Sequence, residues 1–287
     1  MFATLLGPLP RPPLPEGSPA EALVDACLEL QAEHGLEPAI DGGWGLVSGD
    51  VVGSWRATAE RADRLVKAVV AGPWSSGRDA GLIRREILAL ADAGCRWIEV
   101  HEPAAASLGE DGAARARFAD VQGALTRDLG PDLHLTLAIT GGNADAAGID
   151  TILAGAYSSL AVDLIDGPDN WRLAVAVPGE RGVICGALSP HAGSDDGPEM
   201  LLWAARYAAG SKGRGMARVG LATSGSMRDV SWQEASTKVR RLGDAARVVA
   251  MPEDQQRAAL DPRAVDIRSA ALGRVEPRPA PRSRKRS

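Results

Sequence analysis

Residues 80–103 read AGLIRREILALADAGCRWIEVHEP, a helix pattern followed directly by a strand pattern. Ile83, Ile87 and Leu90 recur at the spacing of one helical face, and Gly94 is typical of a helix C-terminus. The apolar stretch after the glycine has the length of a buried strand. This stretch therefore predicts a helix that packs against one strand of an α/β sheet.

The same alternation extends over most of the chain. Eight short apolar or β-branched stretches have the length of strands, and amphipathic segments lie between them. Alternating strands and helices favour a parallel sheet with right-handed crossovers. Eight such units within about 250 residues favour a single (β/α)8 TIM barrel, with an open doubly wound sheet as the alternative. The expected strands are 3–7, 38–41, 67–72, 95–101, 134–140, 159–165, 182–188 and 217–223.

The composition changes near the end of the chain. We expect the barrel to occupy residues 1–250 and a flexible, disordered tail rich in Pro and Arg to occupy residues 251–287. Six basic residues and one acidic residue follow position 273, so residues 1–273 carry a net charge of −10, against −5 for the whole chain. This acidic body argues against nucleic acid as a partner. Only the basic tail could contact nucleic acid or acidic partners, and a solvated tail is the simpler interpretation.

Composition also limits the environment of the protein. Its 45% hydrophobic and 24% charged residues are typical of globular domains. No stretch approaches the roughly 20 apolar residues that span a membrane. The three cysteines cannot all pair, and none lies in a CxxC motif. We therefore expect a cytoplasmic protein with reduced thiols that acts on a small molecule, while the sequence does not indicate its oligomeric state.

Polar residues follow each expected strand from the second onward, where the loops of a barrel form its active-site mouth. His101 and Glu102 are the least ordinary of these, because two adjacent ionisable groups at the end of an apolar strand are costly to desolvate. Such a cost indicates that the pair has a functional role. Alternation sends one of the two inward and the other toward the helices, and we expect catalytic roles for both and for Asp163. His134 begins a strand at the opposite end, so we expect it to be structural. The expected substrate-binding residues are Asp41, Trp44, Trp74, Asn143, Ser189 and Ser224. Trp44 and Trp74 could equally pack as structural side chains at the rim of the barrel. The glycine-rich turn after Ser224 is more typical of a tight turn than of an anion site.

Residues 91–104, ADAGCRWIEVHEPA, resemble the ADAGC…IQIDEPA signature of the cobalamin-independent methionine synthase family, in its catalytic C-terminal barrel. Further landmarks occur in that family's order, and the resemblance covers roughly residues 3–248. It implies a barrel that moves a methyl group from a folate-type donor to a thiol such as homocysteine. In the family, zinc holds the thiolate through one His, two Cys and one Glu. The further landmarks are 4–11, 41–42, 72–73, 142–143 and 224–225.

The residues at the family's zinc-binding positions differ in this chain. The family's His falls on Ala138, its first Cys on Thr140, its Glu on Asp163 and its second Cys on Ser224. Alanine offers no ligand atom, and neutral hydroxyls bind Zn²⁺ far more weakly than thiolates do. The sequence therefore predicts no metal at this place, and any activity would be independent of zinc.

The positions that hold the amino acid have changed as well, because Gly43 and His101 stand where the family has acidic residues. Homocysteine is thus an unexpected acceptor. We favour a diverged transferase with His101 or Glu102 as general base, since an imidazole can take a proton at neutral pH. A harder metal ion on His101, Glu102, Asp163 and His191 is one alternative. A non-catalytic barrel that binds a small molecule is the other.

Overall fold

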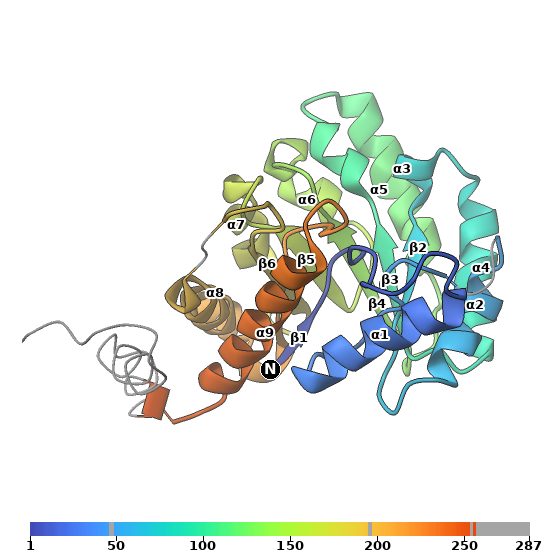
Figure 1. The fold of residues 1–287 in the computed structure, drawn as a ribbon. Coiled ribbons are helices and arrows are strands. Elements are labelled where there is room, and N and C mark those ends of the chain that lie inside the picture. Colours follow the sequence, from blue (N-terminus) through green and yellow to red (C-terminus); the bar gives the residue numbers. More distant parts are fainter. Residues whose placement is uncertain (46–48, 195–196, 253–254, 257–287) are drawn as a thin grey trace, which may run out of the picture.

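The computed structural model describes residues 1–45, 49–194, 197–252 and 255–256. Within these ranges the strands all run parallel in one curled sheet, in the order β1-β7-β6-β5-β4-β3-β2, with the helices outside it (Figure 1). This is an α/β fold consistent with a TIM-barrel-like architecture. The strands are β1 (Phe2–Thr4), β2 (Ala68–Ala71), β3 (Trp97–His101), β4 (His134–Ile139), β5 (Ser159–Asp163), β6 (Gly182–Leu188) and β7 (Val219–Thr223).

The helices lie between successive strands and bury one face against the sheet. Ile83, Ile87 and Leu90, the expected buried face of α4, are all fully buried. The last helix begins with a side-chain cap, because the Ser231 hydroxyl accepts the Glu234 N–H at 3.2 Å. The helices are α1 (Ala20–Glu33), α2 (Val51–Ala59), α3 (Pro73–Ser76), α4 (Ala80–Asp92), α5 (Gly112–Thr126), α6 (Ile149–Ile152), α7 (Trp171–Ala176), α8 (Pro198–Gly210) and α9 (Trp232–Val249).

The segment 38–41, expected as the second strand, forms a single bridge instead. Ala39 pairs with Val66 in parallel, and the Glu37 amide donates to the Ala3 carbonyl at 2.8 Å. The segment therefore contacts the chain at both edges of the sheet, next to β1 and next to β2, without adding a strand between them. The expectation of eight strands was wrong at this position.

Local chemistry explains the missing strand. Pro38 has no N–H group to donate to a ladder. Gly42 and Gly43 follow with φ values of +74° and +82°, which take the chain out of the extended conformation directly after Asp41. Beyond the bridge at Ala39, β2 therefore has no neighbouring strand on this side.

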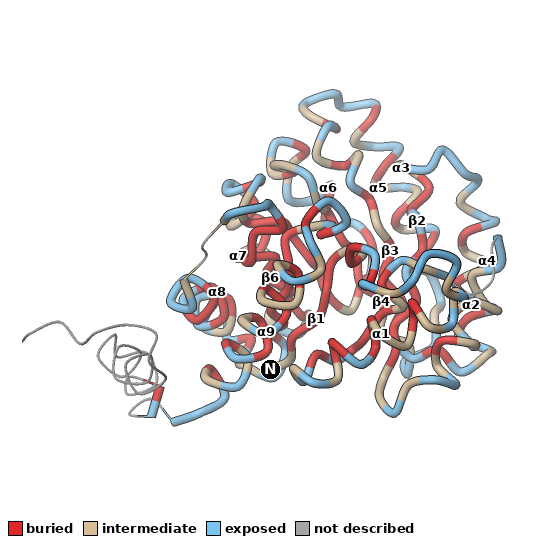
Figure 2. The backbone as a smooth tube through the Cα atoms, in the orientation of Figure 1, coloured by how far each residue is buried: buried red, intermediate tan, exposed pale blue. Residues whose placement is uncertain are grey.

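Aromatic rings fill the inside of the curled sheet at the N-terminal ends of the strands. The rings of Phe2 and Trp97 meet edge to face at 5.2 Å, and His134 lies 3.8 Å from Trp97 between ring centroids. Figure 2 shows the strands as the buried centre of the molecule and exposed residues mainly in loops and on outer helix faces. A cavity of about 510 Å³ also opens at this end, beside Phe2, Trp97 and His134. The active sites of barrel enzymes lie at the opposite end, where the C-terminal ends of the strands meet. A small apolar cluster fills the interior further along, formed by Leu6, Ala138, Ala161, Ile184 and Ala222.

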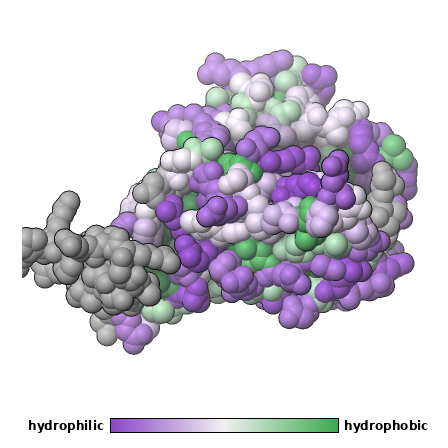
Figure 3. Space-filling model, in the orientation of Figure 1, coloured by the Kyte–Doolittle hydropathy of each residue, from purple (hydrophilic) through white to green (hydrophobic). Residues whose placement is uncertain are grey.

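The surface is mixed in character. Figure 3 shows a mainly hydrophilic face with small hydrophobic patches. Among the described residues, no helix is both long enough and apolar enough to cross a membrane. Cys27, Cys95 and Cys185 are all buried and unpaired. Most of the expected tail, 257–287, lies outside the described residues.

Candidate functional site

A cavity of about 580 Å³ opens beside β2, on the side where the neighbouring strand is missing. Val69 and Ala71 line it, and both are exposed although they belong to the sheet. Ala71 pairs with His101 in the register of β2 and β3, so the cavity reaches the neighbouring strand position, while His101 itself is not one of its lining residues. Other lining residues come from the loop after the bridge, from α2 and from the start of α4, among them Asp41, Asp50, Trp55 and Arg78.

The edge of β2 that faces this cavity leaves backbone groups without strand partners. The Lys67 amide donates to the bridge segment at 2.9 Å, whereas the Gly72 amide donates to His101 of β3 at 2.8 Å. Since successive N–H groups of a strand point to opposite sides, those of Val69 and Ala71 point away from β3, as that of Lys67 does. Neither amide has a hydrogen bond within the described ranges. This edge can therefore hydrogen-bond a ligand in the cavity.

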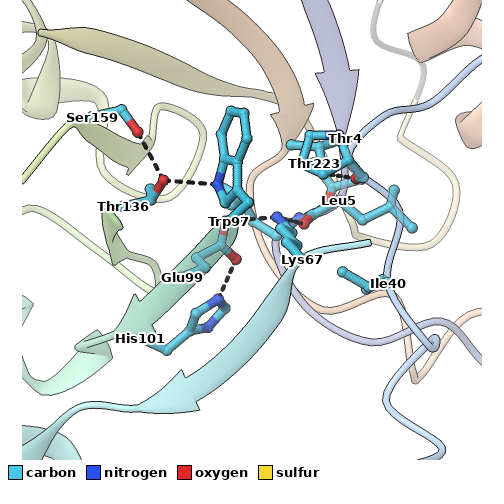
Figure 4. A network of polar contacts seen from close by, with 12 residues as sticks. Thr4, Leu5, Ile40, Lys67, Trp97, Glu99, His101, Thr136, Ser159 and Thr223 are labelled. Carbon is cyan, nitrogen blue, oxygen red and sulfur yellow. Dashed lines mark hydrogen bonds and ion pairs between the residues drawn. The ribbon is translucent and has the colours of Figure 1, made fainter. Parts of the chain in front are cut away.

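A chain of charged side chains crosses the inside of the sheet from β2 to the end of β3 (Figure 4). Lys67 Nζ lies 2.6 Å from Glu99 Oε2 and also donates to the Leu5 carbonyl at 2.8 Å. The other Glu99 oxygen, Oε1, lies 2.6 Å from His101 Nε2. The Lys67 and Glu99 side chains are fully buried, while that of His101 is 19% exposed. His101 is thus the solvent-facing end of this row of three side chains. We refer to Lys67, Glu99 and His101 together as the charged chain.

Burial and pairing set the protonation of the two buried groups. Burial lowers the pKa of Lys67, and the Glu99 carboxylate opposes that shift. Burial alone would raise the pKa of Glu99, but Lys67 and His101 together outweigh it, and the net pKa is lowered. Glu99 is therefore a carboxylate in the folded protein, with a cation on one oxygen and an imidazole on the other.

This geometry prepares His101 for proton transfer. An ionised Glu99 accepts the N–H at Nε2, which leaves Nδ1 as the proton-accepting atom. A carboxylate in this position also stabilises the imidazolium that forms when the ring takes a proton. Lys67 moderates that effect, because it already shares the charge of Glu99. His101 can act as a general base whose orientation is held by its own strand.

Glu102 points the other way, toward the helices, as alternation along the strand predicts. Its carboxylate accepts the backbone amides of Trp74 at 3.1 Å and Ser75 at 2.7 Å, and the Gln122 side chain at 2.9 Å. It is fully buried, and a Cβ at Gly72 would come within 2.2 Å of its carboxyl carbon. Glu102 thus anchors the first turn of α3 to β3, outside the space that His101 faces. The catalytic role expected for it remains a prediction.

Asp163 is likewise occupied by backbone groups. Its side chain accepts the amides of Gly141 at 3.0 Å, Ile165 at 2.9 Å and Asp166 at 3.0 Å, and it is 1% exposed. These bonds tie together the loops after β4 and β5. Its oxygens thus already hold three donors, and the catalytic role expected for Asp163 remains a prediction.

The residues at the family's zinc-binding positions make other contacts in this structure. Ala138 belongs to the apolar cluster inside the sheet, and the Asp163 carboxylate is engaged by backbone amides. Ser224 is 1% exposed, and its hydroxyl has no hydrogen-bond partner in the described part of the chain, yet it is a neutral oxygen. The donors at these positions do not fit a thiolate-binding zinc.

The alternative ion site is not assembled either. His191 pairs with Asp166 at 2.9 Å near the surface, while His101 faces Glu99. Among the residues that the structure describes, no three His, Cys, Asp or Glu side chains lie close enough to share a metal ion. The four expected ligands of a harder ion are therefore directed to different partners.

Of the expected substrate-binding residues, Asp41 lies on the cavity wall. Its carboxylate accepts the amides of Gly43 at 2.7 Å and Gly45 at 3.0 Å and so shapes the loop at the cavity. Trp44 lies under the Arg228 guanidinium, 6.0 Å from the ring centroid. The Nε1 atom of Trp44 is buried without a partner among the described residues. Trp44 itself does not line the cavity beside β2.

The remaining expected binding residues make structural contacts. Trp74 packs edge to face on Phe118 at 5.8 Å between ring centroids. Asn143 accepts the Asp169 amide at 2.8 Å in an exposed loop. The hydroxyl of Ser189, a buried residue, accepts the His191 amide at 3.2 Å. None of these three residues lines the cavity beside β2.

Lys67 and Glu99 were absent from the expected site. Glu99 precedes His101 by two positions, so it shares the inward face of the same strand. A carboxylate on the inward face of an otherwise apolar strand was a usable signal. The Lys67 contact was not predictable in this way, because it depends on how β2 is placed beside β3.

The chain shares its fold with solved structures at low identity. No family model matches the sequence, and no curated protein matches it. A B12-independent methionine synthase from Shewanella sp. W3-18-1, in complex with selenomethionine, aligns with a TM-score of 0.70 and 13% identity, over 90% of this chain and 99% of that one. A putative vitamin-B12 independent methionine synthase from Listeria monocytogenes aligns with a TM-score of 0.70 and 12% identity, over 88% and 98%. Dihydrodipicolinate synthase from Aquifex aeolicus aligns with a TM-score of 0.57 and 12% identity, over 96% and 89%. These matches show a common barrel-like fold, and at this identity they carry no information about activity.

Proposed function

We propose that this chain is a diverged, methionine synthase-like barrel enzyme that transfers a methyl group to a small acceptor other than homocysteine, with His101 as general base. The observation that carries the proposal is the Glu99 carboxylate, whose two oxygens lie 2.6 Å from Lys67 Nζ and 2.6 Å from His101 Nε2. Buried charges of this kind are costly unless they are used or well paired. The proposed fold is a (β/α)8 barrel whose second strand is reduced to the Ala39 bridge.

In the proposed step, the acceptor loses its proton to His101 Nδ1 while it attacks the methyl carbon of the donor. The bond from methyl to donor breaks, and the donor keeps the electron pair. Glu99 stabilises the imidazolium that results. A positioned base takes the place of the metal that activates a thiol in the family, since the family's donor atoms are missing here.

The cavity beside β2 is the proposed substrate site. The Asp41 and Asp50 carboxylates and the unpaired β2 edge provide acceptors and donors, and Trp55 gives an aromatic wall. This lining suits a polar ligand with its own hydrogen-bond donors. A folate-type donor rests on the family resemblance alone. The buried, unpaired thiols favour a reducing compartment such as the cytoplasm.

A non-catalytic, ligand-binding barrel is the second candidate. The observation that favours it is the position of Lys67, because a cation already bound to Glu99 lowers the gain from forming an imidazolium at His101. In that case His101 would contact a ligand without accepting a proton from it.

The first experiment is a thermal-shift screen of the full chain against folates, small thiols, amines and their methylated products. A ligand at about 100 times its Kd stabilises the folded state by about 2.7 kcal/mol. Turnover is then measured for any ligand pair that binds, with an isotope-labelled methyl donor. The proposal fails if ligands bind but no labelled product forms.

His101→Gln tests the role of the base. We expect it to retain ligand binding and to reduce turnover at least about 100-fold, the usual contribution of general base catalysis. His191→Gln is the matched control, because His191 is an exposed histidine that also pairs with a carboxylate. Unchanged turnover in His101→Gln would remove this residue from the mechanism.

A further inference from the structure

The exposed Trp203 and Tyr207 and the half-buried Trp171 form a cluster on α7 and α8, which we call the aromatic shelf. Trp203 and Tyr207 stack at 5.2 Å between centroids, and Trp171 meets them edge to face at 4.8 and 5.3 Å. Trp203 is 48% and Tyr207 45% exposed. The whole chain has seven Trp and two Tyr, so their concentration on one outer face is unusual. Exposed aromatic clusters mark interaction sites.

The chain that follows α9 returns to this part of α8. The Gln256 side chain donates to the carbonyls of Val249 at 3.1 Å and Met251 at 2.6 Å. Its oxygen accepts the guanidinium of Arg206, the neighbour of Tyr207 on α8. The last described residues are thus fastened beside the shelf, and the remaining chain starts from there.

We propose that the segment 274–286, RVEPRPAPRSRKR, docks on the aromatic shelf of its own chain. Prolines at 277, 279 and 281 favour the polyproline II conformation, which aromatic-lined surfaces bind. Arginines at 278 and 282 can place their guanidinium groups over the shelf rings in cation–π contacts. The chemistry of the segment thus complements the chemistry of the shelf.

Charge and reach support the same occupant. The segment carries a net charge of +5, against −10 on residues 1–273. Glu199 precedes Trp203 by one helical turn, so a carboxylate lies at one end of the shelf. About 17 residues lie between Gln256 and the segment, and an unstructured linker of that length would span roughly 23 Å, which is sufficient because the chain starts beside the shelf. Such a tether gives an effective concentration in the millimolar range, so weak contacts are enough.

Docking would also account for the exposed rings, because the segment would cover apolar surface that otherwise favours association between copies. A competing polyanion would withdraw the basic segment and uncover the shelf. The inference concerns the outer helices and is independent of the function proposed for the cavity.

The test is the rate at which trypsin cleaves after Arg282 in the native, full chain, followed by mass spectrometry. Each rate is divided by the rate for the same bond in the unfolded chain. Trp203→Ala/Tyr207→Ala should accelerate cleavage roughly fivefold, because protection follows the docked population. Leu82→Ala/Leu88→Ala on α4 is the matched control, since these leucines are 46% and 38% exposed and lie far from α8 (Figure 1). We expect no change in this control.

A second variant, Pro277→Ser/Pro279→Ser, leaves the shelf intact and should accelerate cleavage to a similar extent. Equal rates for the wild type and the shelf variant would overturn the proposal. Protection that falls when the protein is diluted would overturn it too, because it would show that the segment of a second copy occupies the shelf.

Discussion

Strand β3 directs side chains into two polar networks of opposite character inside the sheet (Figure 4). Toward β2 lies the charged chain, in which a carboxylate joins an ammonium and an imidazole. Toward β4 and β5 lies a neutral chain of Trp97, Thr136, Ser159 and His134. Trp97 Nε1 donates to the Thr136 hydroxyl at 3.0 Å, the Thr136 and Ser159 hydroxyls lie 2.8 Å apart, and His134 Nε2 lies 2.9 Å from Ser159.

The difference shows what each network can do. Each neutral side chain bonds to another side chain of the network, and the network lies at the N-terminal ends of the strands, where the aromatic rings meet. The charged chain ends at a partly exposed imidazole, in register with Ala71, which lines the cavity beside β2. Neutral bonds tie strands together at low electrostatic cost, whereas buried charges are tolerated only while each keeps its partner. Stability and function can therefore be separated by mutating the two networks.

The largest expected effect is that of Lys67→Met. Removal of the ammonium leaves the Glu99 carboxylate buried without its cation, which costs about 3–5 kcal/mol of unfolding free energy. Urea denaturation at neutral pH measures this loss. The double variant Lys67→Met/Glu99→Gln should recover much of it, because no charge is then stranded. A single variant as stable as the wild type would show that the pair is not electrostatically coupled.

Acid should act mainly on the neutral chain through His134. Burial lowers the pKa of His134 to about 4, whereas an unfolded histidine titrates near 6.5. Between these values the unfolded chain binds the extra proton, so stability is complete above about pH 6.5 and falls as the pH drops toward 4. From pH 7 to pH 5 the expected loss is about 2 kcal/mol. His134→Gln should reduce this loss, and His191→Gln should not; equal acid sensitivity in both variants would contradict the assignment.

Sequence reasoning succeeded where the determinants are local. The bounds 182–188 match β6, and alternation placed His101 and Glu102 on opposite faces of β3. It failed where tertiary contacts decide. The amides of Ile165 and Asp166 follow Asp163 closely in sequence. That of Gly141 comes from the loop after β4, and nothing local to Asp163 reveals this third bond. The contact of Lys67 with Glu99 joins residues 32 positions apart, and the spacing of charges along the chain does not reveal it.

The smallest expected effect separates a bonded from an unbonded buried hydroxyl. Ser159 and Ser224 are both nearly fully buried, at 2% and 1% exposure. The Ser159 hydroxyl lies within hydrogen-bond distance of Thr136 and His134, whereas the Ser224 hydroxyl has no partner among the described residues. Ser159→Ala removes a partner from the buried Thr136 and the half-buried His134 and should cost about 1–3 kcal/mol. Ser224→Ala removes an unsatisfied group and should be neutral or slightly stabilising. Paired urea denaturation curves decide the matter. A clear loss of stability in Ser224→Ala would mean that its hydroxyl forms a hydrogen bond in solution. Ser224 would then belong, like Ser159, to the buried polar groups that stabilise the fold.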